Sequence, residues 1–361
     1  MKKKLIQTLL LGILFLFVAS WFYKLICLWG IVLVWKNQLE AKLRCKYAFT
    51  LLGVFFIIGL YAVLPSYFYH TNDRIQLIYQ DEKGNAVPPP ISHYLMNVIL
   101  PEEEIMNLGV WGARFGVRCF PYVGESILKQ FQEDDWNRKI SHFYHPYAKL
   151  NWSGSFMMSG TTSQVCNMMG LPKTQSVYLV KPRTYNPHKK YPVVFFCHGG
   201  LGNWKLYQGL WKDLEDCIVL SVGTRDWSGI YGFEDIKALF TRQLPFLSRM
   251  GYKVDESQLH IMGLSNGGSA VNMAYAKFAN RFKSITFLSI GIHQTHSIDS
   301  KIIMVGGGKD GSSRTLRSAY RKLKSNETQT ALFWDPDETH FILVNQQSDV
   351  LRFLKKEMLN Q

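Results

Sequence analysis

Short apolar runs alternate with longer stretches of helical character from residue 176 to the C-terminus. The run 193–197 reads VVFFC, and such an unbroken apolar run is typical of a strand that is buried on both faces of a sheet. Parallel strands need long crossover connections, usually helices, so the alternation predicts a mostly parallel sheet flanked by helices. We therefore assign residues 176–361 to one α/β domain.

The expected elements follow from the same pattern. Strands are expected at residues 74–80, 177–180, 193–197, 217–222, 259–262, 284–289, 301–305 and 330–333. Helices are expected at residues 207–214, 233–250, 266–278, 314–323 and 348–358, with a kink at Pro245 in the second of them. Residues 82–90 end in three prolines and are interpreted as a turn or linker. Residues 71–175 are treated as an N-terminal extension, either extra strands or a cap.

The N-terminal part is markedly apolar. Charged residues make up only 19% of the chain, against about a quarter in soluble proteins. Two apolar runs cover about residues 5–35 and 47–64, and about 20 apolar residues suffice for a helix to cross a bilayer. These runs predict that residues 1–70 are an integral membrane anchor with two transmembrane helices. The alternatives are a cleaved signal peptide, with a cleavage site near Ala19, and a buried core helix.

The formal net charge of +14 points to a lipid partner and away from nucleic acid. Residues 1–70 contain eight basic residues and one acidic residue, so half of the excess lies beside the apolar runs, where it can meet anionic headgroups. The remainder shows no basic stripe with interleaved aromatic residues, and we expect no nucleic-acid binding.

Two spans would place both ends of the chain on the same side of the membrane. Lys2–Lys4 favour a cytoplasmic N-terminus, whereas the four basic residues in 36–46 favour the opposite orientation. We favour an extracytoplasmic C-terminal domain, because the loop is the longer basic segment.

The segment Gly263-Leu264-Ser265-Asn266-Gly267 has the pattern G-x-S-x-G. A strand is expected before it and a helix after it, which is the context in which this pattern carries a nucleophilic serine on a sharp turn. The glycines leave space where a Cβ atom would clash. Ser265 is therefore the candidate nucleophile, and an ordinary glycine-rich loop is the alternative.

A serine hydroxyl needs a neighbouring base, and the base needs an acid to orient it. His340 follows the last expected strand, at the sheet edge where Ser265 also lies, and is the candidate base. Asp310 lies between them in sequence, just after the strand expected at 301–305, and is the candidate acid. Asp335 and Asp337 are the alternative acids.

Three further groups of residues complete the expected site. Gly199 and Gly200 follow the strand 193–197, and their backbone N–H groups, with that of Asn266, are expected to form an oxyanion hole. His198 beside them is interpreted as a structural hydrogen-bonding residue. Three aromatic residues follow strands at the same edge and are expected either to line a substrate pocket or to pack in the core: Trp204, Trp227 and Tyr231.

Metal ligands are not expected. The six cysteines contain no C-x-x-C pair and no zinc-ligand spacing. His293 and His296 form an H-x-x-H pattern, but no carboxylate accompanies them.

Residues 177–361 resemble α/β-hydrolases of the esterase D, feruloyl esterase and polyhydroxybutyrate-depolymerase-like group. They also resemble, less closely, the catalytic domains of prolyl-oligopeptidase-type enzymes. The resemblance rests on four pieces in the right order: KYPVVFFCHGG from Lys190, LHIMGLSNGG from Leu259, GGKD ending at Asp310, and Thr339-His340. It implies an α/β-hydrolase fold, ester hydrolysis through an acyl-enzyme and no cofactor.

Three functions are compatible with these observations. The first is a membrane-anchored carboxylic-ester hydrolase that acts on a small-molecule or lipid-linked ester. The second is a serine peptidase of the prolyl-oligopeptidase type. The third is a non-catalytic hydrolase-like binding protein, against which the complete Ser265, Asp310 and His340 set counts. The sequence gives no indication of the oligomeric state.

Overall fold

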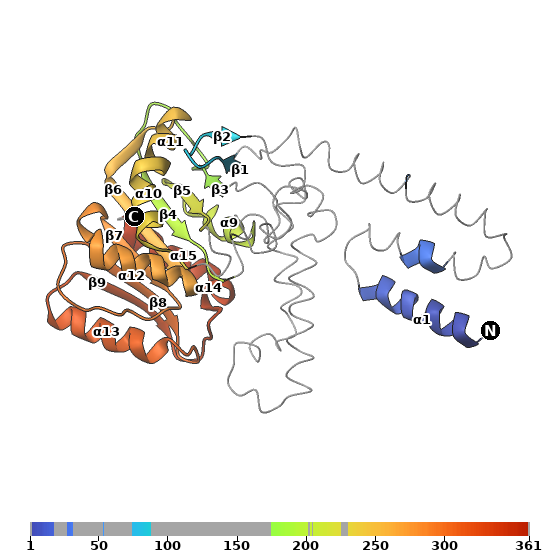
Figure 1. Cartoon of the computed structure of the whole chain (residues 1–361). Helices are drawn as coiled ribbons and strands as arrows, with labels where there is room; N and C mark the ends of the chain where they lie inside the picture. The colour runs from blue at the N-terminus through green and yellow to red at the C-terminus, as the bar shows by residue number, and fades with distance from the viewer. Residues whose placement is uncertain are drawn as a thin grey trace.

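The computed structural model describes residues 2–17, 27–31, 53, 74–87, 175–200, 203, 205–224 and 230–359. Their strands form one nine-stranded sheet in the order β2-β1-β3-β5-β4-β6-β7-β8-β9 (Figure 1). The strands are β1 (Ile75–Gln80), β2 (Ala86–Val87), β3 (Gln175–Val180), β4 (Tyr191–Cys197), β5 (Ile218–Val222), β6 (Val254–Leu264), β7 (Ser284–Leu288), β8 (Lys301–Gly307) and β9 (Thr330–Asp335).

Most of the sheet is parallel. The six strands from β5 through β4, β6, β7 and β8 to β9 pair in parallel, whereas β3 is antiparallel to β5 and β1 is antiparallel to β3. The carboxyl ends of the six parallel strands therefore meet at one edge, which is the edge where α/β sheets place ligands and reacting groups.

Helices cover both faces of the sheet. They are α9 (Lys205–Trp211), α10 (Phe233–Ala238), α11 (Leu244–Arg249), α12 (Gly268–Lys277), α13 (Ser313–Ser325), α14 (Ile342–Asn345) and α15 (Gln347–Leu359). One hydrophobic cluster joins the sheet to α9, α14 and α15, and a second joins it to α10, α11, α12 and α13. In β4, Val194 and Phe196 belong to the first cluster, and Val193 and Phe195 belong to the second. This alternation explains why the strand has no polar position.

The predicted α/β class and the mostly parallel sheet with flanking helices are confirmed. Three local predictions are corrected. Residues 82–90 are not only a turn, because Ala86–Val87 pairs with β1. The single helix expected at 233–250 is three pieces, since the π-helix Leu239–Gln243 separates α10 from α11 just before Pro245. The short helix α14 was not expected.

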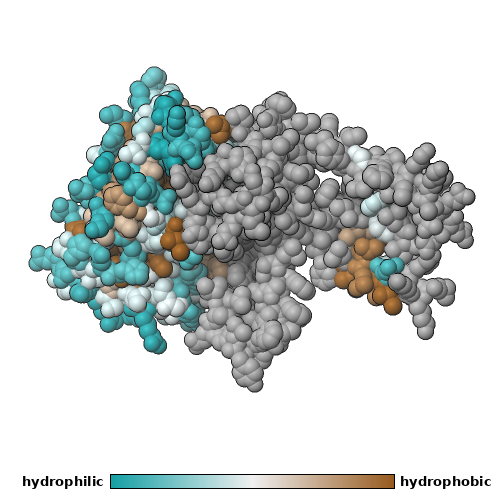
Figure 2. Space-filling model, viewed as in Figure 1, coloured by the Kyte–Doolittle hydropathy of each residue, from teal (hydrophilic) through white to brown (hydrophobic). Residues whose placement is uncertain are grey.

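At the N-terminus, helix α1 (Lys2–Phe17) contains 16 residues. Its side chains leave a large apolar surface open (Figure 2), to which Leu5, Ile6, Leu9, Leu10 and Ile13 contribute. Among the described residues, no helix has both the length and the apolar character needed to cross a membrane. Residues 18–26 and 32–35 of the first predicted span and all of the second span except residue 53 lie outside the described residues. The same holds for residues 71–73 and 88–174 of the predicted extension.

Candidate active site

Ser265 lies at a sharp turn between a strand and a helix. Strand β6 ends at Leu264, residues Ser265–Gly267 form one turn of 3-10 helix, and α12 begins at Gly268. The backbone of Ser265 has φ +52°, a left-handed conformation that L-residues other than glycine rarely adopt. Strain of this kind is found at functional sites that the surrounding structure holds in place. The strand–turn–helix context expected of the G-x-S-x-G pattern is present.

Glycines at the turn are required by close packing. A Cβ atom at Gly263 would overlap the backbone carbonyl of Gly267. A Cβ atom at Gly267 would overlap the backbone carbonyl groups of Cys197 and His198, which end β4 and begin its following loop. The two glycines therefore allow the Ser265 turn to lie directly against the end of β4.

His340 and Asp310 are joined by a hydrogen bond. His340 follows β9, Asp310 follows β8, and His340 Nδ1 lies 3.1 Å from Asp310 Oδ2. Because an ionised carboxylate only accepts hydrogen bonds, Nδ1 carries the proton and Nε2 is left as the acceptor of the ring. The imidazole thus has the tautomer that a general base needs.

Asp310 stays ionised although it is only 7% exposed. Burial alone would raise its pKa, but hydrogen bonds from His340 and from Ser312 outweigh burial and lower the pKa. The Ser312 hydroxyl lies 2.9 Å from Asp310 Oδ2, and the Ser312 N–H donates to Oδ1 at 3.2 Å. Sequence reasoning missed Ser312, although an Asp followed two residues later by Ser is a familiar turn signature.

The two alternative acids have other partners. Asp335 accepts hydrogen bonds from the Asp337 N–H and from Gln346. Asp337 is exposed and lies 3.8 Å from the Lys309 ammonium group. The structure therefore places Asp310, rather than Asp335 or Asp337, against His340.

The segments at the ends of β8 and β9, which contain Asp310 and His340, are held together by glycines. Cβ atoms at Gly307 and Gly308 would overlap the backbone of Glu338 and of Pro336, respectively. Two backbone hydrogen bonds join the same loops, from the Gly308 N–H to Asp335 O and from the Lys309 N–H to Glu338 O, each at 2.8 Å. This close backbone packing brings His340 to Asp310.

Gly199 borders Ser265. A Cβ atom added to Gly199 would lie 3.4 Å from Ser265 Cβ and 3.3 Å from Leu264 O. Gly199 is buried, Gly200 is half-buried, and Asn266 is exposed in the turn beside Ser265. The residues expected to form an oxyanion hole thus come from the two segments that meet at the Ser265 turn.

A buried hydrogen-bond network supports the Gly199 segment. His198 Nε2 accepts from the Thr224 N–H at 3.3 Å, so Nδ1 carries the proton that is donated to Gly199 O at 2.7 Å. The Tyr231 hydroxyl donates to Val222 O at 2.7 Å and accepts from the His198 N–H at 3.0 Å. Burial lowers the pKa of His198 to about 4, although the hydrogen bond to Gly199 acts in the opposite direction. His198 is therefore the neutral structural residue that the sequence led us to expect.

Of the three aromatic residues expected to line a pocket or to pack in the core, the structure describes only Tyr231. It is 4% exposed, and its N–H donates to Ser269 Oγ at 2.7 Å, while the Ser269 hydroxyl donates to Asn266 O. Tyr231 thus links the Gly199 segment to the Ser265 turn from within the core, which favours the packing alternative for this residue. Trp204 and Trp227 lie outside the described residues.

A mostly parallel sheet, with a serine on a strand–helix turn and an acid and a histidine later in the chain, defines the α/β-hydrolase fold. No protein-family model matches the chain, and no curated protein matches it by sequence.

Partial structural similarity is found to solved structures that include a peptidase and two esterases. A Pyrococcus horikoshii acylaminoacyl peptidase has 14% identity and a TM-score of 0.41, with 51% of this chain and 40% of that protein covered. A thermostable esterase has 19% identity and a TM-score of 0.38, with 50% and 58% covered. A CE1 ferulic acid esterase from Anaeromyces mucronatus has 14% identity and a TM-score of 0.39, with 52% and 86% covered. The matched region thus spans about two-fifths of the length of the peptidase.

Proposed function

We propose that this chain is a serine hydrolase that cleaves carboxylic esters through an acyl-enzyme. The observation that carries the proposal is the hydrogen bond between His340 and Asp310 at the sheet edge where Ser265 occupies its strained turn. A serine, a histidine and a buried carboxylate with these roles form the constellation that activates a serine hydroxyl in several unrelated folds.

In the first half of the reaction, Ser265 Oγ attacks the ester carbonyl carbon while His340 Nε2 takes the hydroxyl proton. The Asp310 carboxylate stabilises the imidazolium that forms. The tetrahedral intermediate then expels the alcohol, which receives that proton from His340, and the acyl group remains bound to Ser265. In the second half, His340 Nε2 takes a proton from a water molecule, whose oxygen attacks the acyl carbon. The bond from that carbon to Ser265 Oγ then breaks, Oγ receives the proton from His340, and the carboxylic acid is released.

The negative oxygen of the tetrahedral intermediate needs hydrogen-bond donors. Backbone N–H groups of Gly199 or Gly200, together with that of Asn266, are the proposed donors, because the Gly199 and Asn266 segments meet beside Ser265. Donors held in place before the reaction lower its barrier because they need no rearrangement when charge develops. The buried His198 and Tyr231 network supplies that rigidity.

We further propose that the N-terminal segments anchor the protein in a membrane, with the hydrolase domain on the extracytoplasmic side. The two apolar runs and the exposed apolar surface of α1 support this location. A lipid-linked ester is then a natural substrate. Protease treatment of intact cells tests the location: digestion of the C-terminal domain supports the proposal, whereas digestion only after lysis reverses the orientation.

A substrate panel tests the proposed reaction. The full chain and Ser265→Ala are compared on an ester, a thioester and an anilide that carry the same acyl group. We expect Ser265-dependent turnover of the ester, with much slower turnover of the anilide. Anilide turnover as fast as that of the ester would favour the peptidase alternative, and an absence of Ser265-dependent turnover on all three would contradict the hydrolase proposal.

A further inference from the structure

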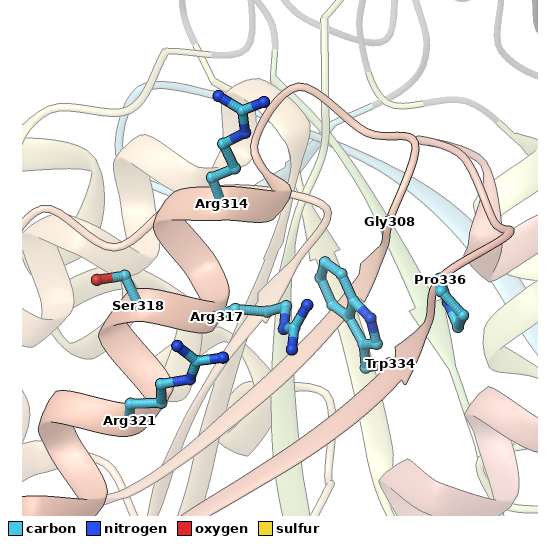
Figure 3. A pocket seen from close by; sticks show the side chains of 7 residues that line it. All are labelled: Gly308, Arg314, Arg317, Ser318, Arg321, Trp334 and Pro336. Atoms are coloured by element: carbon cyan, nitrogen blue, oxygen red, sulfur yellow. The ribbon is translucent and has the colours of Figure 1, made fainter.

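A cavity of about 410 Å³ lies between α13 and the end of β9, outside the proposed Ser265 site (Figure 3). Arg314, Arg317 and Arg321 of α13 form one side, and Trp334 and Pro336 form the other. Figure 3 shows Arg317 and Arg321 extending from the helix toward Trp334, while Arg314 rises from the first turn.

The three arginines lie on one face of α13, at positions i, i+3 and i+7. Like charges at these spacings repel each other and destabilise a helix. The helix dipole adds to the cost, since the N-terminal end that holds Arg314 and Arg317 is its positive end. By contrast, Lys322 and Lys324 lie in the last turn, where the dipole favours cations. Favourable charge interactions within the helix therefore do not explain Arg314 and Arg317.

Counter-charges within the protein do not explain them either. Helix α13 has no acidic residue, and none of the three arginines forms an ion pair with a described carboxylate. The acids closest to the cavity in sequence have other partners: Asp335 bonds Gln346, and Asp337 pairs with Lys309. The cavity thus holds three clustered cations, none of which is paired with a carboxylate of the described residues.

Trp334 contributes an aromatic wall to the cavity, and this wall contacts one of the arginines. The Arg317 guanidinium lies over its indole ring, 5.1 Å from the ring centre. Stacking on an aromatic face restricts an arginine side chain while leaving the N–H groups at its edge free to donate. Arg317 is thus oriented before any ligand binds, which lowers the entropy cost of binding.

We propose that this cavity binds a phosphate group, held by Arg317 and Arg321 with Arg314 adding charge at its rim. Planar guanidinium groups match phosphate oxygens with paired hydrogen bonds, and such bonds are stronger than neutral ones. The group can come from a free phosphate or from the headgroup of an anionic phospholipid. The proposal does not depend on ester hydrolysis at Ser265.

Calorimetric titration of the full chain with inorganic phosphate tests the free-anion source. The variants are Arg317→Gln, Arg321→Gln and their combination, and Lys322→Gln is the matched control. Lys322 is an exposed cation on the same helix that does not line the cavity, so its loss changes the net charge by the same amount as each single arginine variant, and Lys322→Gln combined with Lys324→Gln matches the double variant. We expect the double variant to weaken phosphate binding by on the order of tenfold or more, and the control to have less than about a twofold effect.

Sedimentation with vesicles tests the lipid source. Vesicles of phosphatidylcholine alone are compared with vesicles that also contain phosphatidylglycerol. A preference for the anionic vesicles that is lost in the double variant but kept in Lys322→Gln supports a headgroup, with or without binding of free phosphate. Circular dichroism checks that each variant is folded, and a variant that fails is replaced by the corresponding Arg→Lys change, which keeps the charge and removes paired hydrogen bonding.

Two results would overturn the proposal. One is phosphate binding and vesicle preference that are both unchanged in the cavity variants. The other is a loss of phosphate affinity or of vesicle preference in Lys322→Gln that equals the loss in the cavity variants. Such a result would mean that the helix attracts anions only through diffuse charge.

Discussion

At the scale of single residues, Asp310 shows how a nearly buried carboxylate remains ionised. Burial opposes ionisation, yet hydrogen bonds from His340 and Ser312 lower its pKa. The carboxylate can therefore fix the His340 tautomer and stabilise the imidazolium that the proposed acylation would form. Both roles require the charge as well as the shape of the side chain.

Asp310→Asn is expected to reduce turnover by on the order of 10⁴, because a carboxamide keeps the shape, removes the charge and permits the wrong tautomer. Steady-state hydrolysis of a chromogenic ester measures the loss. Asp335→Asn and Asp337→Asn are the matched controls from the neighbouring loop, and each is expected to lose far less. A severe loss in Asp337→Asn together with a nearly silent Asp310→Asn would move the acid to that loop.

Buried His198 makes stability depend on pH. Burial disfavours the charged form and lowers its folded-state pKa to about 4, against 6.5 for a histidine side chain in water. Between these values the unfolded chain binds a proton that the folded chain does not, so the free energy of unfolding falls as pH falls from 6.5 to 4. The shift corresponds to roughly 3 kcal/mol. His260, with the same folded pKa for the same main reason, adds a contribution of the same sign.

Urea unfolding of wild type and His198→Gln between pH 4 and 7 checks this expectation. The variant is expected to be less stable near pH 7, because it loses the hydrogen bonds to Thr224 and Gly199, but also to have a shallower pH dependence. His260→Gln provides a second variant with the same expected change in slope. A slope that is the same in wild type and in both variants would contradict the assignment of neutral, buried histidines.

The residues that were predictable from the sequence are those that follow strands in chain order. Ser265, Asp310 and His340 were proposed because the carboxyl ends of parallel strands share one edge, and the structure places all three at that edge. Contacts between segments that are distant in the sequence could not be predicted from this rule. The hydrogen bonds of Tyr231 to His198 and Val222, and the contact between Arg317 and Trp334, depend on packing that sequence periodicity does not encode.

At the scale of elements, the segments that follow β8 and β9 pack closely against each other. Their backbones can touch because Gly307 and Gly308 have no side chain at the contact. Gly307→Ala would drive a Cβ atom into the backbone of Glu338, two residues before His340. We expect a loss of about 1–3 kcal/mol in the free energy of unfolding, typical of overpacking, and reduced ester turnover because His340 is displaced.

Gly311→Ala is the matched control from the same loop, since a Cβ atom there meets nothing within 4 Å. Its stability and turnover are expected to remain close to those of wild type. Urea unfolding and ester hydrolysis measure both properties. Equal effects of the two substitutions would show that the loops are not held by close backbone packing at Gly307.

Elements with strong apolar patterns were predictable, and weakly patterned ones were not. Strand β2 has only two residues, too few for any alternation to be visible. The break between α10 and α11 was expected at Pro245, but the structure places a π-helix at Leu239–Gln243, just before it. Gln243 from this π-helix pairs with Gln80 of β1 through two amide hydrogen bonds of 2.9 and 3.1 Å. That buried contact joins segments 163 residues apart, and the local sequence contains no signal of it.

At the scale of the whole molecule, the sheet gathers the proposed reacting groups from loops far apart in the chain. Ser265 follows β6, Asp310 follows β8 and His340 follows β9, and these strands are joined in parallel through β7. The sheet also extends toward the N-terminus, since β1 pairs along its full length with β3. Residues 75–80 of the predicted extension are therefore part of the same sheet as the strands that carry Ser265, Asp310 and His340.

Labelling with a fluorophosphonate probe tests the central claim most directly, because such a probe reacts with an activated serine and needs no knowledge of the substrate. The account predicts that the full chain is labelled on Ser265, and that Ser265→Ala is folded but unlabelled. Because Ser265 is at a turn, its truncation is not expected to leave a large cavity in the core. Labelling that persists in Ser265→Ala, or the absence of labelling in a folded wild-type chain, would contradict the account.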